Sequence, residues 1–234
     1  MNTRFTFAAL CPLFCSIPIC TWAGQPLVTD DAAVVAPKTC QVEAWTVTNR
    51  DATAYLMQPA CNPTGNFELA VGIGTLRPDE GTRSSWIQLQ GKTVLFALED
   101  KSWSFGVAGG AARDTGQPRG GPAFQTYYAK GLASWYPNDD LEFDLNLGGA
   151  NTYGSGSYAL AGAAVQYKIV DQVQLLAEVI KDAPGKAAWQ AGGRFLVMPE
   201  QLEVYVAYRS SFGVWLNEWG VNIGFRLQTP AFLP

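Results

Sequence analysis

The sequence predicts an all-β protein: an antiparallel, up-and-down transmembrane β-barrel of about 12 strands that follows a cleaved signal peptide. The first observation is strict alternation of apolar and polar residues. In Leu141–Leu147 every odd position is apolar and every even position is polar, and Leu202–Arg209 and Trp219–Leu227 repeat the pattern. The second is a low charged fraction, 15% against roughly 25% in soluble domains. The third is frequent punctuation by 24 Gly and 14 Pro. Period-two alternation is typical of a sheet with one apolar and one polar face.

Residues 1–23 are expected to be a secretory signal peptide. Arg4 supplies the positive charge, Phe5–Cys20 is apolar, and Ala23 ends the small-residue cleavage site. The alternative is a transmembrane anchor, which the shortness of the stretch and its two prolines disfavour. The signal directs export, and the predicted location is the outer membrane of a bacterial cell.

Residues 24–38 are expected to form a periplasmic N-terminal segment. They lack alternation and carry two adjacent carboxylates, Asp30 and Asp31. One hypothesis is that the segment plugs the barrel, with these carboxylates docked against Arg194 and Arg226. The alternative is a disordered leader, or two aspartates that merely cap a turn. The barrel itself is expected over 39–228, and a C-terminal tail over 229–234.

Cys40 and Cys61 are the two cysteines that follow the signal peptide. A hairpin that turns at Arg50 and Asp51 places them directly opposite each other, within disulfide reach. We therefore predict a disulfide that clamps the open end of the first hairpin. The alternative is two unpaired thiols.

Strands are expected in order along the chain, separated alternately by short turns and by mostly longer loops rich in Gly or Pro. An even number of strands with this alternation is typical of outer-membrane barrels. The predicted ranges are 40–49, 52–61, 66–76, 84–98, 101–113, 124–136, 141–151, 157–169, 172–182, 186–197, 201–210 and 217–228.

The two faces of the strands distinguish a membrane barrel from a secreted β-sandwich, which is the alternative fold. The predicted inner positions are small or polar and the outer positions apolar, and strands of ten or more residues are long for a sandwich. Tryptophans fall near the predicted strand ends, where interfacial aromatic girdles lie. They are Trp86, Trp103, Trp135, Trp189 and Trp219.

Charged and polar residues at inward positions are the candidates for the lumen lining. Arg194 and Glu203 flank a turn symmetrically and are expected to face each other. Such residues either tune passage through a pore or neutralise a filled interior, and a barrel of 12 strands lies between the filled and the open sizes. Glu142 and Asp144 are expected to project from the same face of their strand. Their two possible roles are to bind a cation or to remain solvated carboxylates of the lumen. The predicted lining residues are Glu68, Lys130, Glu142, Asp144, Lys168, Glu178, Arg194, Glu203, Arg209, Asn222 and Arg226.

Composition excludes several function classes. The sequence has no histidine, which removes Ser-His and Cys-His nucleophile pairs and His-liganded zinc or haem. The net charge of −4 lacks the basic footprint of a nucleic-acid binder. We therefore predict a protein that is not an enzyme and has no metal or cofactor.

The segment that starts the expected mature chain resembles a known family. Pro26, Leu27, Thr29, Asp30 and Asp31, followed by Glu43 in the first strand, match the opening motif of the outer-membrane family named for the meta-pathway of phenol degradation. The resemblance implies an outer-membrane barrel associated with uptake of aromatic compounds.

Together these observations predict a passive channel or transporter for small solutes, aromatic or hydrophobic ones included. The alternatives are a closed structural or adhesive barrel without transport, and a soluble periplasmic β-protein that binds a ligand. The expected partners are outer-membrane lipids, the barrel-assembly machinery and the small solute.

Overall fold

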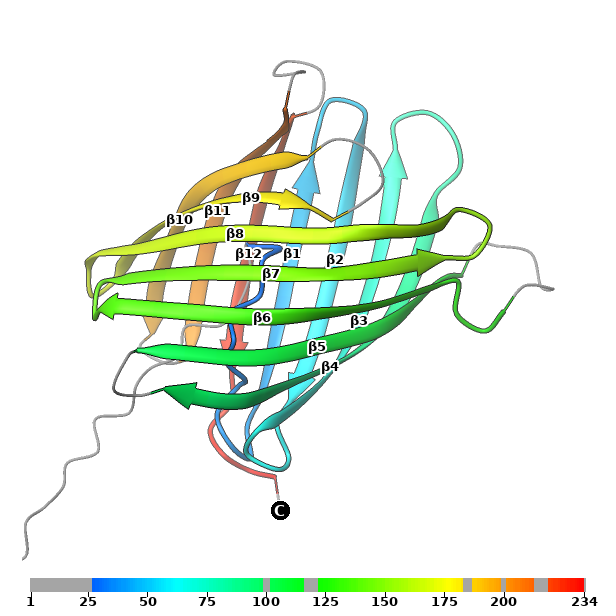
Figure 1. Ribbon diagram of the computed structural model, residues 1–234. Coiled ribbons are helices and arrows are strands. Elements are labelled where there is room, and N and C mark those ends of the chain that lie inside the picture. The colour runs from blue at the N-terminus through cyan, green and yellow to red at the C-terminus, as the bar shows by residue number, and fades with distance from the viewer. Residues whose placement is uncertain are drawn as a thin grey trace, which may run out of the picture.

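The computed structural model describes residues 27–98, 102–115, 122–182, 187–198, 201–212 and 219–233. Strands dominate it, and in those ranges no helix is long and apolar enough to cross a membrane. Figure 1 shows the strands wrapping around a common interior. Their bounds are β1 Cys40–Thr48, β2 Ala52–Cys61, β3 Phe67–Pro78, β4 Ser84–Leu98, β5 Trp103–Asp114, β6 Thr126–Asn138, β7 Leu141–Thr152, β8 Gly156–Val170, β9 Val173–Lys181, β10 Ala188–Met198, β11 Leu202–Ser211 and β12 Trp219–Gln228.

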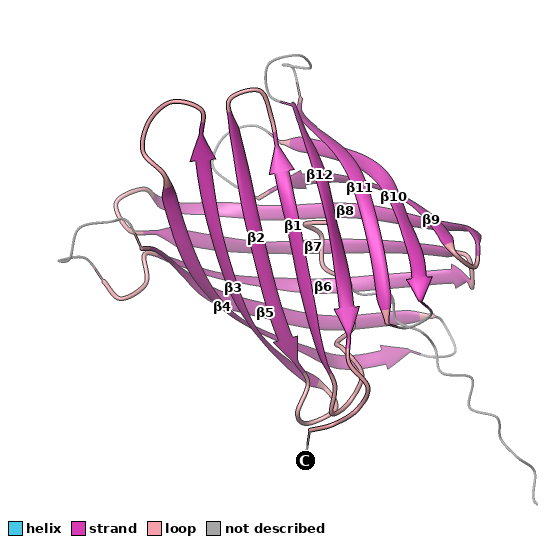
Figure 2. Cartoon of the chain, turned by 180° about the vertical axis from the view of Figure 1, so that it is seen from behind, coloured by secondary structure: helices cyan, strands magenta, loops and turns pink. Residues whose placement is uncertain are grey.

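The strands form one closed antiparallel barrel. Each pairs with its neighbours in sequence, and β1 pairs with β12 to close the ring, with Glu43 opposite Arg226. Figure 2 shows this closing seam from behind. The predicted fold class is confirmed, and all twelve strands lie within a few residues of their predicted bounds. The expected signal peptide falls on residues outside the described ranges.

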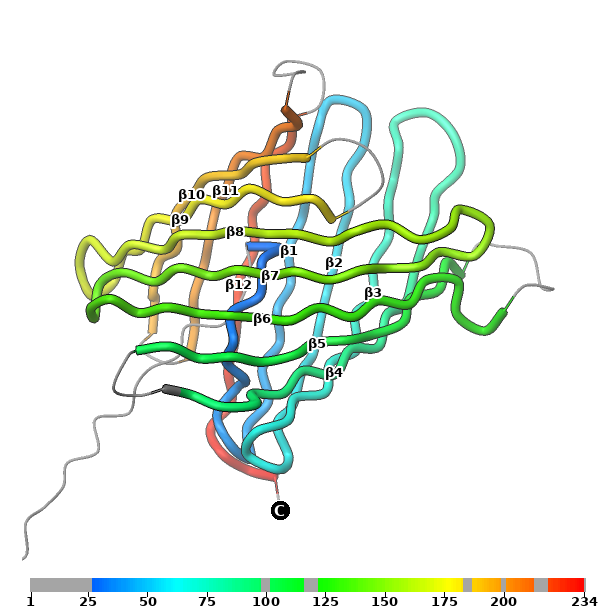
Figure 3. Tube along the Cα trace, in the orientation of Figure 1, coloured from blue at the N-terminus to red at the C-terminus, as the bar shows by residue number. Residues whose placement is uncertain are grey.

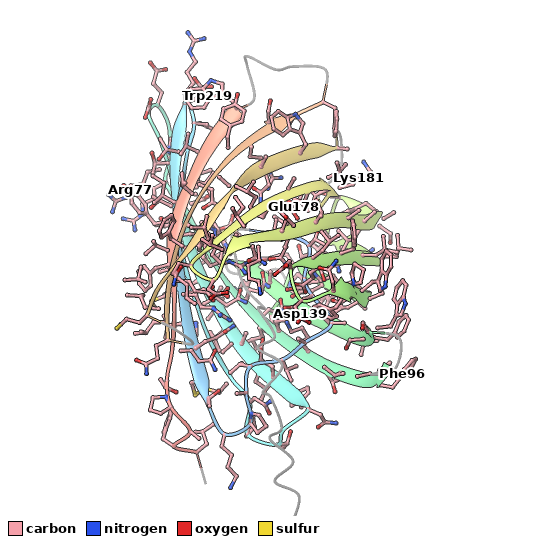
Figure 4. The ribbon with its side chains drawn as sticks, turned by 90° about the vertical axis from the view of Figure 1, so that its left-hand side faces the viewer. Arg77, Phe96, Asp139, Glu178, Lys181 and Trp219 are labelled. Carbon is pink, nitrogen blue, oxygen red and sulfur yellow. A yellow bond between two sulfur atoms is a disulfide. The ribbon has the colours of Figure 1, made fainter. Side chains whose placement is uncertain are left out.

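The barrel is apolar outside and polar inside. Leu147 and Ile223 are 60% and 57% exposed on the outer face, whereas Asp144 and Asn222 are buried on the inner face. Figure 4 shows the Glu178 side chain inside the barrel, whereas Phe96 lies at its outer edge. An apolar exterior facing hydrocarbon is what a transmembrane barrel requires.

Aromatic side chains form rows near both ends of the barrel, as interfacial girdles do. One row follows the end where the short turns lie, which we call the short-turn end, and another follows the opposite end, the loop end. Ring centroids within each row lie 5.0–6.3 Å apart, the first row comprising Phe96, Phe105, Trp103, Trp135 and Phe143, and the second Trp189, Tyr208 and Trp219.

Trp86 is a correction to the predicted girdle. It has the same parity as the inward residues of β4, and its indole lies over Gly74 of β3. A Cβ added to Gly74 would collide with the Trp86 ring, so the missing side chain of Gly74 makes room for the indole. Proximity to a strand end indicated a girdle, but parity along the strand determines the face.

Cys40 and Cys61 form a disulfide with Cα atoms 4.0 Å apart. The two residues are directly paired in the β1–β2 register, as the hairpin numbering predicted. The bridge closes the open end of the first hairpin at the short-turn end, beside the point where the N-terminal segment leaves the lumen.

Candidate functional site

The N-terminal segment runs through the interior of the barrel. In Figures 1 and 3 it is the dark blue chain that lies between β6–β8 on one side and β1 and β12 on the other. We call residues 27–35 the strap. Most of its side chains are buried against the inner wall: Leu27, Thr29, Asp31, Ala32, Ala33 and Val35.

Backbone amides of the strap donate hydrogen bonds to acceptors on the wall. The N–H groups of Val28 and Thr29 both donate to the buried carboxylate of Glu178 on β9, at 2.8–3.1 Å. The Asp30 N–H donates to Oδ1 of Asn146 on β7 at 2.8 Å, and the Asn146 amide donates back to the Asp30 carbonyl at 2.6 Å. Hydrogen bonds to a charged acceptor are about twice as strong as neutral ones.

The second half of the strap is held in the same way. The Ala32 N–H donates to Ser134 Oγ at 2.8 Å, and Ser134 in turn donates to Asp144 at 2.6 Å. The Val35 N–H donates to Glu68 at 2.9 Å, and the Asn62 amide donates to the Val35 carbonyl at 2.6 Å. The wall thus binds the main chain of the strap along its length.

The two aspartates of the strap form ion pairs with lysines. Asp31 lies 3.2 Å from Nζ of Lys92 on β4, and Asp30 lies 2.6 Å from Nζ of Lys130 on β6. The prediction that these aspartates dock against Arg194 and Arg226 was wrong. Both arginines instead form ion pairs with Glu203 on β11.

The ion pairs act differently on the two strap carboxyls. Burial raises the pKa of Asp30, but the charges of Lys130 and Lys92 outweigh it, so that this pKa lies below its ordinary value. Burial raises the pKa of Asp31 above its ordinary value, because Lys92 offsets it only in part and the neighbouring Asp30 charge adds to it.

A glycine on the wall makes room for the strap. The Thr29 hydroxyl would lie 2.5 Å from a Cβ built on Gly162 of β8, and the Thr29 Cβ would lie 3.3 Å from it. Any side chain at position 162 would therefore press against the strap.

The segment leaves the lumen through a tight turn anchored at the short-turn end. The Thr39 N–H donates to the Ala36 carbonyl at 3.2 Å, and Lys38 has a φ of 62°. Pro37 in the second position and a positive φ in the third are features of a type II turn. The N–H groups of Phe232 and Leu233 donate to the Lys38 carbonyl at 3.0 and 3.1 Å. The C-terminal tail thus holds the base of the strap, next to the disulfide.

Most of the predicted lining residues lie at inward positions of the wall. Glu203 joins Arg194 and Arg226, and Arg194 also donates to Gln174 at 3.0 Å. Those buried on the inner face are Glu68, Glu142, Asp144, Glu178, Arg194, Glu203, Asn222 and Arg226; Lys130, near them, is 14% exposed.

Two predicted lining residues lie at the rims instead, which is a correction. Lys168 pairs at 3.0 Å with Asp140 in the β6–β7 turn, and Arg209 pairs at 3.1 Å with Asp182 beyond β9. Both have inward parity, but they stand at the ends of their strands, where their charges reach solvent.

The wall carboxylate of Asp144 is hydrogen-bonded to neighbouring wall side chains. Asp144 accepts from Ser134 and from Gln166, the latter at 3.1 Å. Within the described ranges, no group of three or more His, Cys, Asp or Glu side chains is arranged to hold a metal ion.

Comparisons with known proteins agree with the barrel fold. The model of the family described as "Uncharacterised conserved protein UCP029691" matches residues 16–225. The chain belongs to this family.

Solved structures similar to this family member include porins. The KdgM porin superposes with a TM-score of 0.64 at 8% identity, over 80% of this chain and 98% of that one. The NanC porin gives a TM-score of 0.60 at 10% identity, over 82% and 100%. A KdgM porin in complex with disordered oligogalacturonate gives 0.61 at 8% identity, over 80% and 98%. Identities this low show the shared fold alone. Among curated proteins no match is found.

Several residues that hold the strap were not among the predicted lining residues: Asn62 after β2 and Ser104 on β5, and three others on β4, β6 and β7, namely Lys92, Ser134 and Asn146. The last three lie at even, inward positions of strands that alternation had predicted. They would have been found by assigning every second residue of the predicted strands 84–98, 124–136 and 141–151 to the inner face.

Proposed function

We propose that this protein is a bacterial outer-membrane channel for small solutes. The observation that carries the proposal is a closed barrel with an apolar exterior and an interior lined by charged and amide side chains. A polar interior of this kind suits the passage of solutes that need hydrogen bonds, because water is replaced by wall groups during transit. The porin fold of the neighbouring structures supports the same function.

Small aromatic solutes with a hydroxyl group are the proposed cargo. An open depression of about 670 Å³ lies toward the loop end of β6–β8, where Tyr128 and Tyr158 border it from the inner face and Tyr127, which is 53% exposed, borders it from the outer face. Tyr128 also donates to Gln90 at 2.6 Å and accepts from Gln88 at 3.0 Å. Aromatic faces beside amide groups suit a ring that carries a hydroxyl. The resemblance of residues 25–32 to the phenol-degradation family supports this choice.

A closed barrel without transport is the second candidate, and one observation favours it. Side chains deep in the interior are almost fully buried, with Arg194 and Gln190 each 1% exposed and Ser134 0%. In this function the barrel supports its loops, for adhesion or envelope integrity, and its interior stays filled.

Solute uptake by proteoliposomes distinguishes the two candidates. Purified barrel in vesicles of outer-membrane lipid is exposed to phenol, to a neutral sugar and to an organic anion, and swelling rates are compared with those of protein-free vesicles. The channel function predicts swelling above the protein-free rate, fastest for solutes that donate hydrogen bonds. Swelling equal to the protein-free rate for every solute, including with variants that release the strap, would refute it.

A further inference from the structure

The strap occupies the space through which a solute would pass. Its residues are buried between opposite walls, and its contacts reach β3, β4, β6, β7 and β9. The interior in this arrangement is closed by a part of the chain that is not itself a strand. A channel function therefore requires the strap to move.

The two ends of the segment are held differently. The base is fixed by the Ala36–Thr39 turn, by the tail residues bonded to Lys38 and by the Cys40–Cys61 bridge. The deep half, Leu27–Ala32, has noncovalent contacts alone: two small apolar clusters, one at Leu27 and one at Ala32, and a larger set of hydrogen bonds and ion pairs. Such contacts can be exchanged for water or for a solute, so the deep half can leave while the base stays attached.

Removal of the strap would expose a wall rich in carboxylates. The buried wall acids are Glu43, Glu68, Glu142, Asp144, Glu178 and Glu203, whereas the wall cations beside them are Lys92, Lys130, Arg194 and Arg226. Glu178 and Glu68 would lose the amide donors that the strap supplies. An unsatisfied buried carboxylate is costly, so a solute that offers N–H or O–H donors, or a cation, would replace those donors favourably.

We propose that the strap is a tethered gate: residues 27–35 close the lumen by occupying its binding groove, and their release opens a path that prefers cations and neutral hydrogen-bond donors over anions. This inference rests on the proposed channel function and specifies its regulation. Asp30 and Asp31 act as the latch, because their ion pairs with Lys130 and Lys92 join the strap to two strands of the wall.

A reversible lock tests the position of the strap independently of transport. In a Thr29→Cys/Gly162→Cys variant the two Cβ atoms would lie about as close as the 3.3 Å between the Thr29 Cβ and a Cβ built on Gly162, near the roughly 3.5–4.5 Å of disulfides. Oxidation of the variant in outer membranes should yield a disulfide between positions 29 and 162, detected by peptide mass. Each single variant and the wild-type chain serve as controls. Absence of the bridge, with rapid maleimide labelling of both single variants, would overturn the proposal.

Conductance in planar bilayers then tests the gate. The oxidised lock should reduce the wild-type current at least about tenfold, and reductant should restore it, with reductant on wild type as the control for the native bridge. The latch variant Asp30→Asn/Asp31→Asn should raise the open fraction at least about tenfold, the change that corresponds to ~1.4 kcal/mol. Asp139→Asn/Asp171→Asn makes the same charge change in exposed turns and should leave the current unaltered. A KCl gradient should give a reversal potential of the sign expected for cation preference.

The outcomes separate failure of the gate from failure of the channel. A bridge that forms without changing the current would show that the strap lies off the path, which overturns the gate and leaves the channel standing. Anion preference in the latch variant would overturn the proposed selectivity. The bridge could also form while neither the wild-type barrel nor any variant conducts. That outcome would refute the channel function, and with it the gate, and would leave the strap as a segment that only fills the interior.

Discussion

Glu178 is the residue on which closure of the strap should depend most. Its carboxylate accepts from two strap amides, those of Val28 and Thr29, and is 3% exposed. A hydrogen bond to a charged group contributes about 1.5–3 kcal/mol, so Glu178→Ala should weaken strap closure by about 3–6 kcal/mol. Since ~1.4 kcal/mol is a factor of ten, the population of the released strap should rise roughly 10²- to 10⁴-fold.

Hydrogen exchange measured by mass spectrometry reads this population directly, because local opening limits the exchange of protected amides. In the Glu178→Ala variant the peptide covering 27–35 should exchange faster by that factor, while the peptides of β1 and β12 keep their rates. Gln174→Ala is the matched control. Gln174 lies on the inner face of the same strand, but it contacts Arg194 rather than the strap. Strap exchange that is unchanged in Glu178→Ala, or that is equally fast in the control, would refute the reasoning.

Three further predictions concern the latch, the disulfide and the lipid-facing surface. Lys92→Met leaves Asp31 buried without its ion-pair partner and should weaken strap closure by about 3–5 kcal/mol. The measurement is hydrogen exchange of the strap amides, which should be faster in the variant. Adding Asp31→Asn should restore most of the protection. Cys40→Ser/Cys61→Ser removes the crosslink between residues with a sequence separation of 21 and should lower the free energy of unfolding in urea by about 3 kcal/mol. The reduced wild-type barrel is the control and should unfold with the same free energy as the variant. An unchanged free energy of unfolding in the variant would contradict the expectation. Leu145→Arg places a charge at a 47% exposed position of the outer face and should lower the free energy of unfolding in lipid vesicles by about 2–4 kcal/mol. The control variant Leu145→Ala should lower it by less. Equal free energies of unfolding for the two variants would indicate that this surface does not face hydrocarbon.

The fold could be predicted from the sequence because each strand carries its own information. Over Leu141–Leu147 of β7, apolar and polar residues alternate without a break, and the observed burial follows the same period. The disulfide was predictable for a related reason. A two-stranded hairpin fixes the sum of paired residue numbers, so the position of one turn determined that Cys40 faces Cys61.

The candidate site was less predictable, because parity gives the face of a residue but not its height in the barrel or its neighbours across the lumen. Lys168 and Arg209 have inward parity but stand at the rims. The partners of the strap come from several strands around the lumen, and only closure of the ring brings Lys92 and Lys130 near Asp31 and Asp30.

The composition of the inner wall is better explained by reversible closure than by stability of the barrel. A buried ion pair is often no more stabilising than apolar side chains of similar volume, so a barrel that stays closed gains little by placing Lys92 opposite Asp31. Moreover, acceptors such as Glu178 and Glu68 are satisfied by amides of a segment outside the strands. A permanently filled interior does not require polar residues at these positions, because apolar side chains of similar volume fill the same space. A reversible gate requires a wall that forms hydrogen bonds with the strap when closed and with water or solute when open. Such a wall needs polar groups, and the charged side chains of the lumen supply them.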